Sequence, residues 1–202
     1  MPTPWMVPPI WAGKTVAILA GGPSLLASLP AVERAVAAGR ARALAVNNAF
    51  QVAPWADWLH ASDYAWWRHH AQSALKFEGI KTAAQEMPFP AVHYLHRPPE
   101  IAWTQDKAQI AGPSSAHHAA VIAMHAGAAR VVLCGVDCRT DTASHWHGDH
   151  PLPLRNSSAS TLQNAVKAWA ALSREAPAEI INCSPGSAVT CFPCMPIEDA
   201  LC

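Results

Sequence analysis

A glycine-rich turn near the start of the chain has the residue types that suit anion binding. Gly21, Gly22, Pro23 and Ser24 directly follow a short apolar run. Glycine lets a backbone turn sharply and approach a ligand, proline fits the first position of a helix, and serine offers both an amide and a hydroxyl. Because a helix N-terminus favours negative charge, the turn predicts a phosphate or carboxylate site; the alternative is a tight turn that binds nothing. The spacing is neither GxGxxG nor a Walker loop, so neither an NAD site nor a kinase-type ATP site follows.

A histidine-rich loop later in the chain is the second group with chemical potential. His145, His147, Asp149 and His150 match H-x-H-x-D-H, the metal-binding run of the metallo-β-lactamase superfamily. Such enzymes also need histidines well downstream, whereas His150 is the last histidine of this chain. We therefore do not expect a zinc hydrolase. We interpret His150, with His147 as its competitor, as a general base, because imidazole has a pKa near neutral; a surface loop without a catalytic role is the alternative.

Polar residues collect where the predicted strands end. The apolar runs at 15–20, 43–46, 57–61 and 130–135 are each typical of a strand buried on both faces of a parallel sheet. An amide side chain both donates and accepts hydrogen bonds, and hydroxyls and carboxylates bind ribose or sugar hydroxyls; turn formation and helix capping are the alternatives. Besides the glycine turn, the predicted nucleotide-binding residues are Asn47, Asn48, Ser62, Asp63, Ser114, Ser115, Gly135 and Asp137.

The alternation of strands and helices predicts an α/β fold of Rossmann-like build, a mostly parallel sheet with helices on both faces in a single domain. In such sheets ligands lie beyond the carboxyl ends of the strands, which is where the polar residues gather. We expect an irregular lead-in at 1–13, the domain at 14–185 and a tail at 186–202. Further strands are expected at 81–85, 92–96 and 179–183, and helices that end near Gly39, Leu75, Ala126 and Glu175.

The composition of the chain limits the classes of partner that we expect it to bind. The 202 residues carry a formal net charge of zero with histidine neutral, which argues against a nucleic-acid partner. No stretch approaches the roughly 18 consecutive apolar residues of a membrane span, and the first residues lack the pattern of a signal peptide, so we expect a cytoplasmic protein with reduced cysteines. Only 14% of residues are charged and nine are tryptophan, which favours a homo-oligomer.

The order of the motifs resembles two related groups of proteins. Ala-Gly-Gly-Pro-Ser-Leu at 20–25, Val-Asn-Asn at 46–48, the serine pair 114–115, Leu-Cys-Gly-Val-Asp at 133–137 and the histidine loop follow one another over roughly 15–185. One group is the bacterial sialyltransferases that build lipooligosaccharide. The other contains archaeal 6-hydroxymethylpterin pyrophosphokinase-like proteins and flagellin-glycosylation accessory factors. Phage and prophage proteins with a similar H-W-x-G-D-H-P loop resemble the chain most closely.

The resemblance implies a nucleotide-dependent transferase, in first place a glycosyltransferase that uses a nucleotide-sugar donor and an acceptor. In the sialyltransferases the phosphate loop and the asparagine pair hold CMP, and a late histidine, by position His150, activates the acceptor. Gly21 stands where those enzymes carry asparagine, and the histidine loop is shorter and richer in histidine, so sialic acid itself is not implied.

A second hypothesis is diphosphoryl transfer from ATP, with Mg²⁺ on Asp63, Asp137 or Asp149. A third is a phage accessory protein that binds without catalysis.

Overall fold

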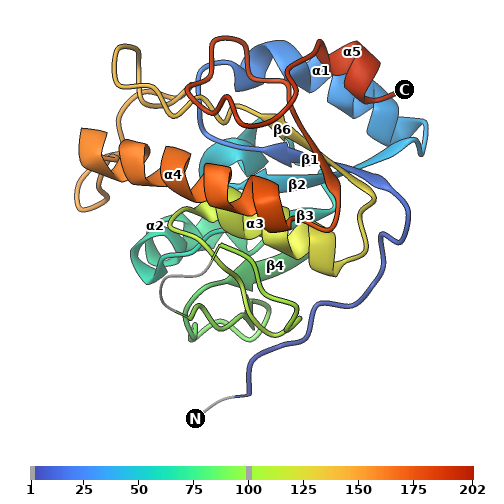
Figure 1. Ribbon diagram of the computed structural model, residues 1–202. Coiled ribbons are helices and arrows are strands. Elements are labelled where there is room, and N and C mark those ends of the chain that lie inside the picture. Colours follow the sequence, from blue (N-terminus) through green and yellow to red (C-terminus); the bar gives the residue numbers. More distant parts are fainter. Residues whose placement is uncertain (1–2, 99–101) are drawn as a thin grey trace.

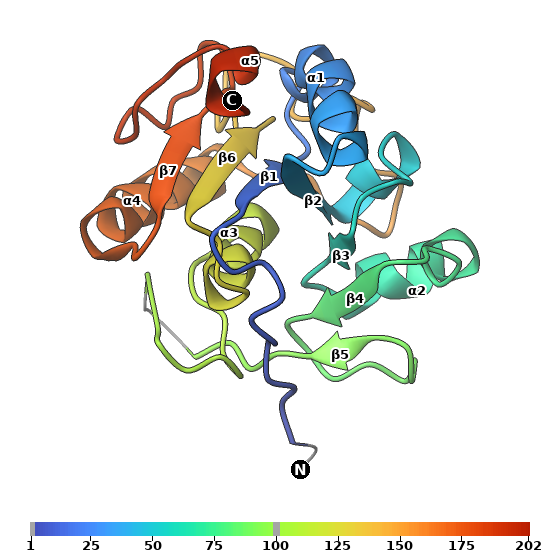
Figure 2. The same cartoon turned by 90° about the vertical axis from the view of Figure 1, so that its right-hand side faces the viewer.

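The computed structural model describes residues 3–98 and 102–202 and confirms the predicted α/β architecture. One sheet has the strand order β5-β4-β3-β2-β1-β6-β7, and every neighbouring pair of strands is parallel. Figure 2 shows the strands fanned by the twist of the sheet. The strands are β1 (Thr15–Leu19), β2 (Ala41–Val46), β3 (Trp58–His60), β4 (Ile80–Ala83), β5 (His93–Tyr94), β6 (Arg130–Cys134) and β7 (Glu179–Asn182).

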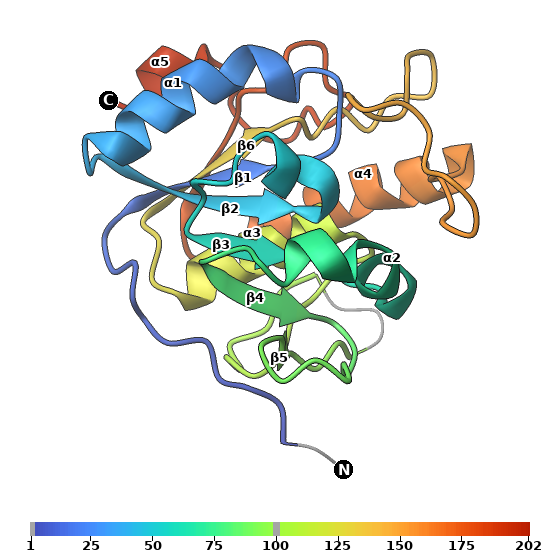
Figure 3. The ribbon, with the colours of Figure 1, turned by 180° about the vertical axis from the view of Figure 1, so that it is seen from behind.

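Helices cover both faces of this sheet. Figure 1 shows α3 and α4 on one face, and Figure 3 shows α1, α2 and α5 on the opposite face. Within the described residues, no helix combines the length and the apolar character that crossing a bilayer requires. The helices are α1 (Leu25–Ala37), the 3₁₀ helix η1 (Asn47–Gln51), α2 (Tyr64–Ala74), α3 (Ser115–His125), α4 (Ala159–Glu175) and α5 (Ile197–Ala200), so the four predicted helix ends are found at Ala37, Ala74, His125 and Glu175.

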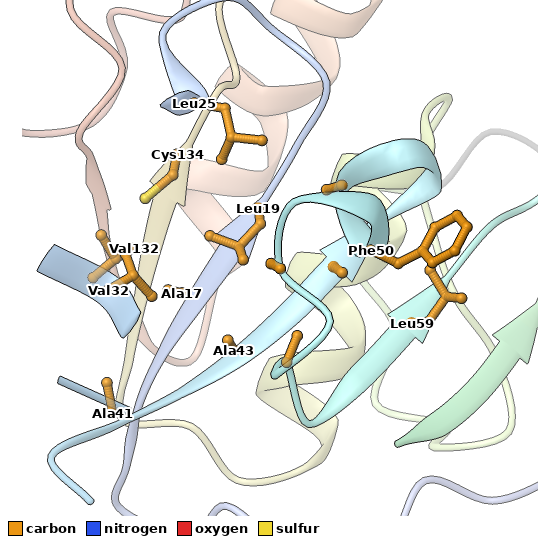
Figure 4. Close-up of a cluster of buried hydrophobic side chains, with 14 of the residues drawn as sticks. Ala17, Leu19, Leu25, Val32, Ala41, Ala43, Phe50, Leu59, Val132 and Cys134 are labelled. Atoms are coloured by element: carbon orange, nitrogen blue, oxygen red, sulfur yellow. The ribbon is translucent and has the colours of Figure 1, made fainter. Parts of the chain in front are cut away.

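The central strand β1 shows why its sequence is a continuous apolar run. Val16 and Ile18 belong to the core under α3 and α4, whereas Ala17 and Leu19 belong to the core under α1. Successive side chains of a strand point to opposite faces, so a strand covered on both sides must be apolar throughout. Figure 4 shows the α1 face, where small alanine side chains of the sheet leave room for Val32 of α1.

The two strand predictions at 81–85 and 92–96 correspond to shorter strands than expected. β4 covers four residues, and β5 pairs with it over His93 and Tyr94 only. Pro88 and Pro90 lie between the two strands. Proline has no N–H to donate to a sheet, so the segment around these residues cannot extend the pairing.

The tryptophans build the core of the single chain. Five are buried, and the other four are half-buried. Trp66 and Trp67 pack in the core under α1, and Trp169 packs in the core on the opposite face. The number of tryptophans therefore does not by itself indicate a surface that a partner covers. The buried ones are Trp11, Trp58, Trp66, Trp67 and Trp169.

The chain order places a crevice beside β1. From β1 the chain builds β2 to β5 on one side, and then returns through α3 to place β6 on the other side. The loops that follow β1 and β6 therefore leave in different directions. Such a switch point is where parallel α/β sheets bind ligands.

Candidate functional site

A cavity of about 670 Å³ opens at this switch point, beyond the carboxyl ends of the strands. Loops after β1, β2, β3 and β6, the start of α3 and the histidine-rich loop line it. Of the residues singled out in the sequence, Pro23, Ser24 and Asp149 are not part of the lining. Those that do line it are Gly21, Gly22, Asn47, Asn48, Ser62, Asp63, Ser114, Ser115, Gly135, Asp137, His145, His147 and His150.

The glycine turn is locked to the loop after β6. The Gly22 N–H donates to the Gly135 carbonyl at 2.8 Å. Ser24 donates its N–H to Asp137 Oδ2 at 3.0 Å and its hydroxyl to Asp137 Oδ1. This differs from the expectation that Ser24 offers both groups to a ligand. Because β6 lies beside β1, a carboxylate 113 positions away in the sequence takes these donors instead.

Only a glycine can occupy position 22 in this arrangement. A Cβ there would lie 2.6 Å from the Gly135 carbonyl oxygen and would also overlap the Asp137 carboxylate. At Gly21, by contrast, a Cβ would meet His145 Cδ2 at 2.9 Å, and that ring can move. The two adjacent glycines therefore differ in what surrounds them.

We expect Gly22→Ala to lower the free energy of unfolding by about 1–3 kcal/mol, as overpacking against fixed groups does. Gly21→Ala is the matched control, because the same added methyl group meets only a side chain that can rotate. Urea unfolding of both variants measures the difference. Equal losses in the two variants would show that the packing of Gly22 against the β6 loop does not hold the turn.

Both asparagines line the cavity, and Asn48 presents a hydrogen-bond donor to it. Asn48 is buried, and its Oδ1 accepts a hydrogen bond from Trp66 Nε1 at 2.8 Å. Indole N–H only donates, so the oxygen must face Trp66 and the Asn48 NH₂ group is left for a ligand. Asn47 has a φ of 50°, a left-handed conformation that asparagine tolerates better than most residues. The pair therefore begins η1 and lines the cavity at the same time.

Two serines of the lining are oriented by a buried histidine, His118. His118 Nε2 lies 2.9 Å from the Gly112 carbonyl oxygen, so this nitrogen carries the hydrogen. Burial, with His60 as a second cause, lowers the pKa of His118 well below its ordinary value, and the ring is neutral. Its Nδ1 then accepts from the Ser62 hydroxyl at 2.8 Å, and Ser62 accepts from Ser115 at 2.7 Å. Ser115 is thus left with lone pairs that can accept a hydrogen bond from a ligand hydroxyl.

The three histidines of the histidine-rich loop, His145, His147 and His150, form one cluster. Ring centroids of His145 and His147 lie 5.0 Å apart, those of His145 and His150 4.7 Å, and those of His147 and His150 4.8 Å. The backbone N–H of Trp146 donates to the Gly21 carbonyl at 2.9 Å, which holds the loop against the glycine turn. Burial, followed by the neighbouring imidazoles, lowers the pKa of His145 to about 4.

Three arginines of the lining were missed in the sequence. Arg97, Arg139 and Arg155 face the same cavity and could neutralise a diphosphate. Arg139 makes two hydrogen bonds to Asp141, at 2.8 and 2.7 Å. Each arginine lies in a loop and in no recognisable motif, so only the folded chain reveals that they converge.

The candidate Mg²⁺ ligands do not gather at one point. Asp63 and Asp137 both line the cavity, whereas Asp149 is exposed and outside the lining. Within residues 3–98 and 102–202, the single group of three or more side chains spaced to share a metal ion is His145, His147 and His150. The arrangement therefore does not favour an ion held by three aspartates.

Comparison with known proteins shows similarity at the level of the fold. No family model matches the chain, and no curated protein matches its sequence. The MAf glycosyltransferase from Magnetospirillum magneticum AMB-1 superposes with a TM-score of 0.63 at 16% identity, over 97% of this chain and 35% of that one. The chain thus spans about a third of that enzyme. The sialyltransferase CstII from Campylobacter jejuni, in complex with the substrate analogue cytidine-5′-monophosphate, superposes with a TM-score of 0.54 at 12% identity, over 93% of this chain and 87% of that one. This chain therefore shares its fold with a glycosyltransferase and with a sialyltransferase.

Proposed function

We propose that this chain is a glycosyltransferase that takes a nucleotide sugar as donor. One observation carries the proposal: a single cavity at the switch point brings the amide and hydroxyl groups of the strand ends together with arginines and the imidazoles of the late loop. The shared fold with a glycosyltransferase and with a CMP-bound sialyltransferase supports the same choice.

In this proposal the strand ends hold the donor. The Asn48 NH₂ group donates to the base or ribose, and Ser115 accepts from a sugar hydroxyl. Arg97 and Arg155 contact the phosphates, because a guanidinium group matches phosphate oxygens in geometry and charge. The glycine turn lines the site but does not bind the phosphates, because the Gly22 and Ser24 amides already have partners.

In this proposal the acceptor binds beside the histidine-rich loop. The acceptor hydroxyl attacks the anomeric carbon, its proton passes to the imidazole of His150, and the bond to the nucleotide breaks with its electron pair on the phosphate oxygen. His147, 4.8 Å away between ring centroids, is the competing base. A well-placed base contributes about 10²- to 10⁴-fold to a rate, and the arginines would stabilise the departing charge.

A nucleotide panel in a thermal-unfolding assay tests the proposal. A nucleotide at 100 times its Kd stabilises a protein by about 2.7 kcal/mol, which in a chain of this size raises Tm by about 5–10 °C. We expect CMP or UDP to give such a shift without Mg²⁺. A shift with ATP that requires Mg²⁺ would support diphosphoryl transfer instead, and no shift with any nucleotide would leave a non-catalytic binding protein.

Matched variants separate binding in the cavity from binding elsewhere. Asn47→Ala and Ser62→Ala remove groups that line the cavity and should reduce the nucleotide-induced shift. Ser73→Ala removes an exposed hydroxyl at the end of α2 that donates a hydrogen bond to the His70 carbonyl, and it should keep the full shift. A shift that survives both Asn47→Ala and Ser62→Ala would place the nucleotide outside this cavity.

A further inference from the structure

The histidine cluster has a feature that a single general base does not require. One nitrogen each of His145, His147 and His150 can be chosen so that all three lie within 4.8 Å of one another. His145 Nδ1 and His150 Nδ1 are buried and make no hydrogen bond to any described residue. Buried polar atoms normally have a partner, so two such atoms in one cluster call for an explanation.

A metal ion explains the convergence of the three imidazoles. Zn²⁺ binds imidazole nitrogen at about 2.0–2.1 Å, which places three ligands of a tetrahedral site about 3.4 Å apart. Movement of the rings by about 1 Å, as rotation about side-chain bonds allows, closes the cluster to that size. Imidazole is a ligand of choice for zinc and its first-row neighbours, whereas Mg²⁺ and Ca²⁺ require oxygen. We propose that His145, His147 and His150 bind one Zn²⁺ ion, or a similar first-row divalent ion, with an open position that faces the cavity.

The site proposed here needs no histidine from further along the chain, whereas the lack of one was the reason for not expecting a zinc hydrolase from the sequence. Three imidazoles within six positions supply three ligands, and a water or substrate atom supplies the fourth, as in open catalytic zinc sites. The hydrogen bond from the backbone N–H of Trp146 to the Gly21 carbonyl holds the loop in place. Asp149, exposed and outside the cluster, is not a ligand in this proposal.

Metal binding would change how the acceptor is activated, a consequence that rests on the proposed function. A nitrogen bound to a metal has no lone pair left for a proton. His145, His147 and His150 would then hold the ion instead of accepting the proton, and the ion would supply a bound water whose pKa zinc lowers to about 7. The ion itself can bind whether or not the chain transfers a sugar.

Isothermal titration of Zn²⁺ into the untagged, chelator-treated chain, with no nucleotide present, tests the site directly. We expect one ion per chain, confirmed by elemental analysis after dialysis. Each of His145→Gln, His147→Gln and His150→Gln should weaken binding by more than the 10- to 100-fold that loss of an outer-shell partner typically causes. Asp149→Asn and the exposed His96→Gln are the controls and should bind as the parent does.

The proposal fails if the parent binds no zinc at micromolar concentration, or if the His150→Gln variant binds it as tightly as the parent. Far-UV circular dichroism and urea unfolding of each metal-free variant show whether a loss of zinc binding is due to unfolding. Because the titration contains no nucleotide, failure here leaves the nucleotide-sugar proposal standing. Conversely, zinc binding with no response to any nucleotide would retain the site and reject the transferase.

Discussion

Turnover by the His150→Gln variant is expected to fall about 10²- to 10⁴-fold below that of the parent, whereas its affinity for the nucleotide stays unchanged. His150 lies in the histidine-rich loop, whereas the groups proposed to bind the donor come from the strand ends. In the proposed mechanism the substitution therefore removes the proton acceptor and leaves the donor-binding groups in place. Single-turnover rates with a nucleotide-sugar donor, together with nucleotide titrations, measure the two quantities separately. The His96→Gln variant, altered at an exposed position outside the cavity, should match the parent in both.

The same substitution at the other two histidines identifies the role of the cluster. If one imidazole is the base, only His150→Gln or only His147→Gln is strongly impaired, and His145→Gln stays active. If the cluster holds a metal ion, all three variants lose turnover together and lose zinc together. If each of the three single variants turns over like the parent, the histidine-rich loop has no part in the mechanism.

The second large effect is a loss of stability in mild acid. His60 and His117 are buried, and burial lowers the pKa of His60 to about 3 and that of His117 to about 4. Burial also lowers the pKa of His118 well below its ordinary value. In the unfolded chain these residues titrate near 6.5. At pH values between the folded-state pKa and the unfolded-state pKa, the unfolded chain binds protons that the folded chain does not. The free energy of unfolding therefore has its full value above about pH 7 and falls as the pH drops below 6.5.

Each buried histidine contributes a slope of about 1.4 kcal/mol per pH unit in this window, so three contribute up to about 4 kcal/mol per unit. That is a large part of the 5–15 kcal/mol that stabilises a typical domain. Urea unfolding at pH 7.5, 6.5 and 5.5 measures the slope. His117→Gln can keep the hydrogen bond to the Ala102 carbonyl but does not titrate, so its slope should be shallower by about one proton. The exposed His96→Gln is the control, and equal slopes in His117→Gln and the parent would contradict the assignment.

The elements of the fold could be predicted from the sequence because their signals are local. The run at 15–20 alternates between two buried faces, and Ser114 and Ser158 accept hydrogen bonds from the N–H groups that open α3 and α4. A strand or a helix start depends on neighbours within a few positions, so these features follow from residue order alone. That the polar residues gather at one edge follows from the parallel sheet, since all its strands end there.

Only the tertiary structure decided which of these residues contact one another. The Ser24 donors were available for an anion in the sequence, and in the fold Asp137 takes them because β6 pairs with β1. The link from His118 to Ser62 joins residues 56 positions apart. The gathering of Arg97 and Arg155 at one cavity has the same origin. Such contacts depend on the order of strands in the sheet and on loop paths, for which neither periodicity nor spacing carries a signal.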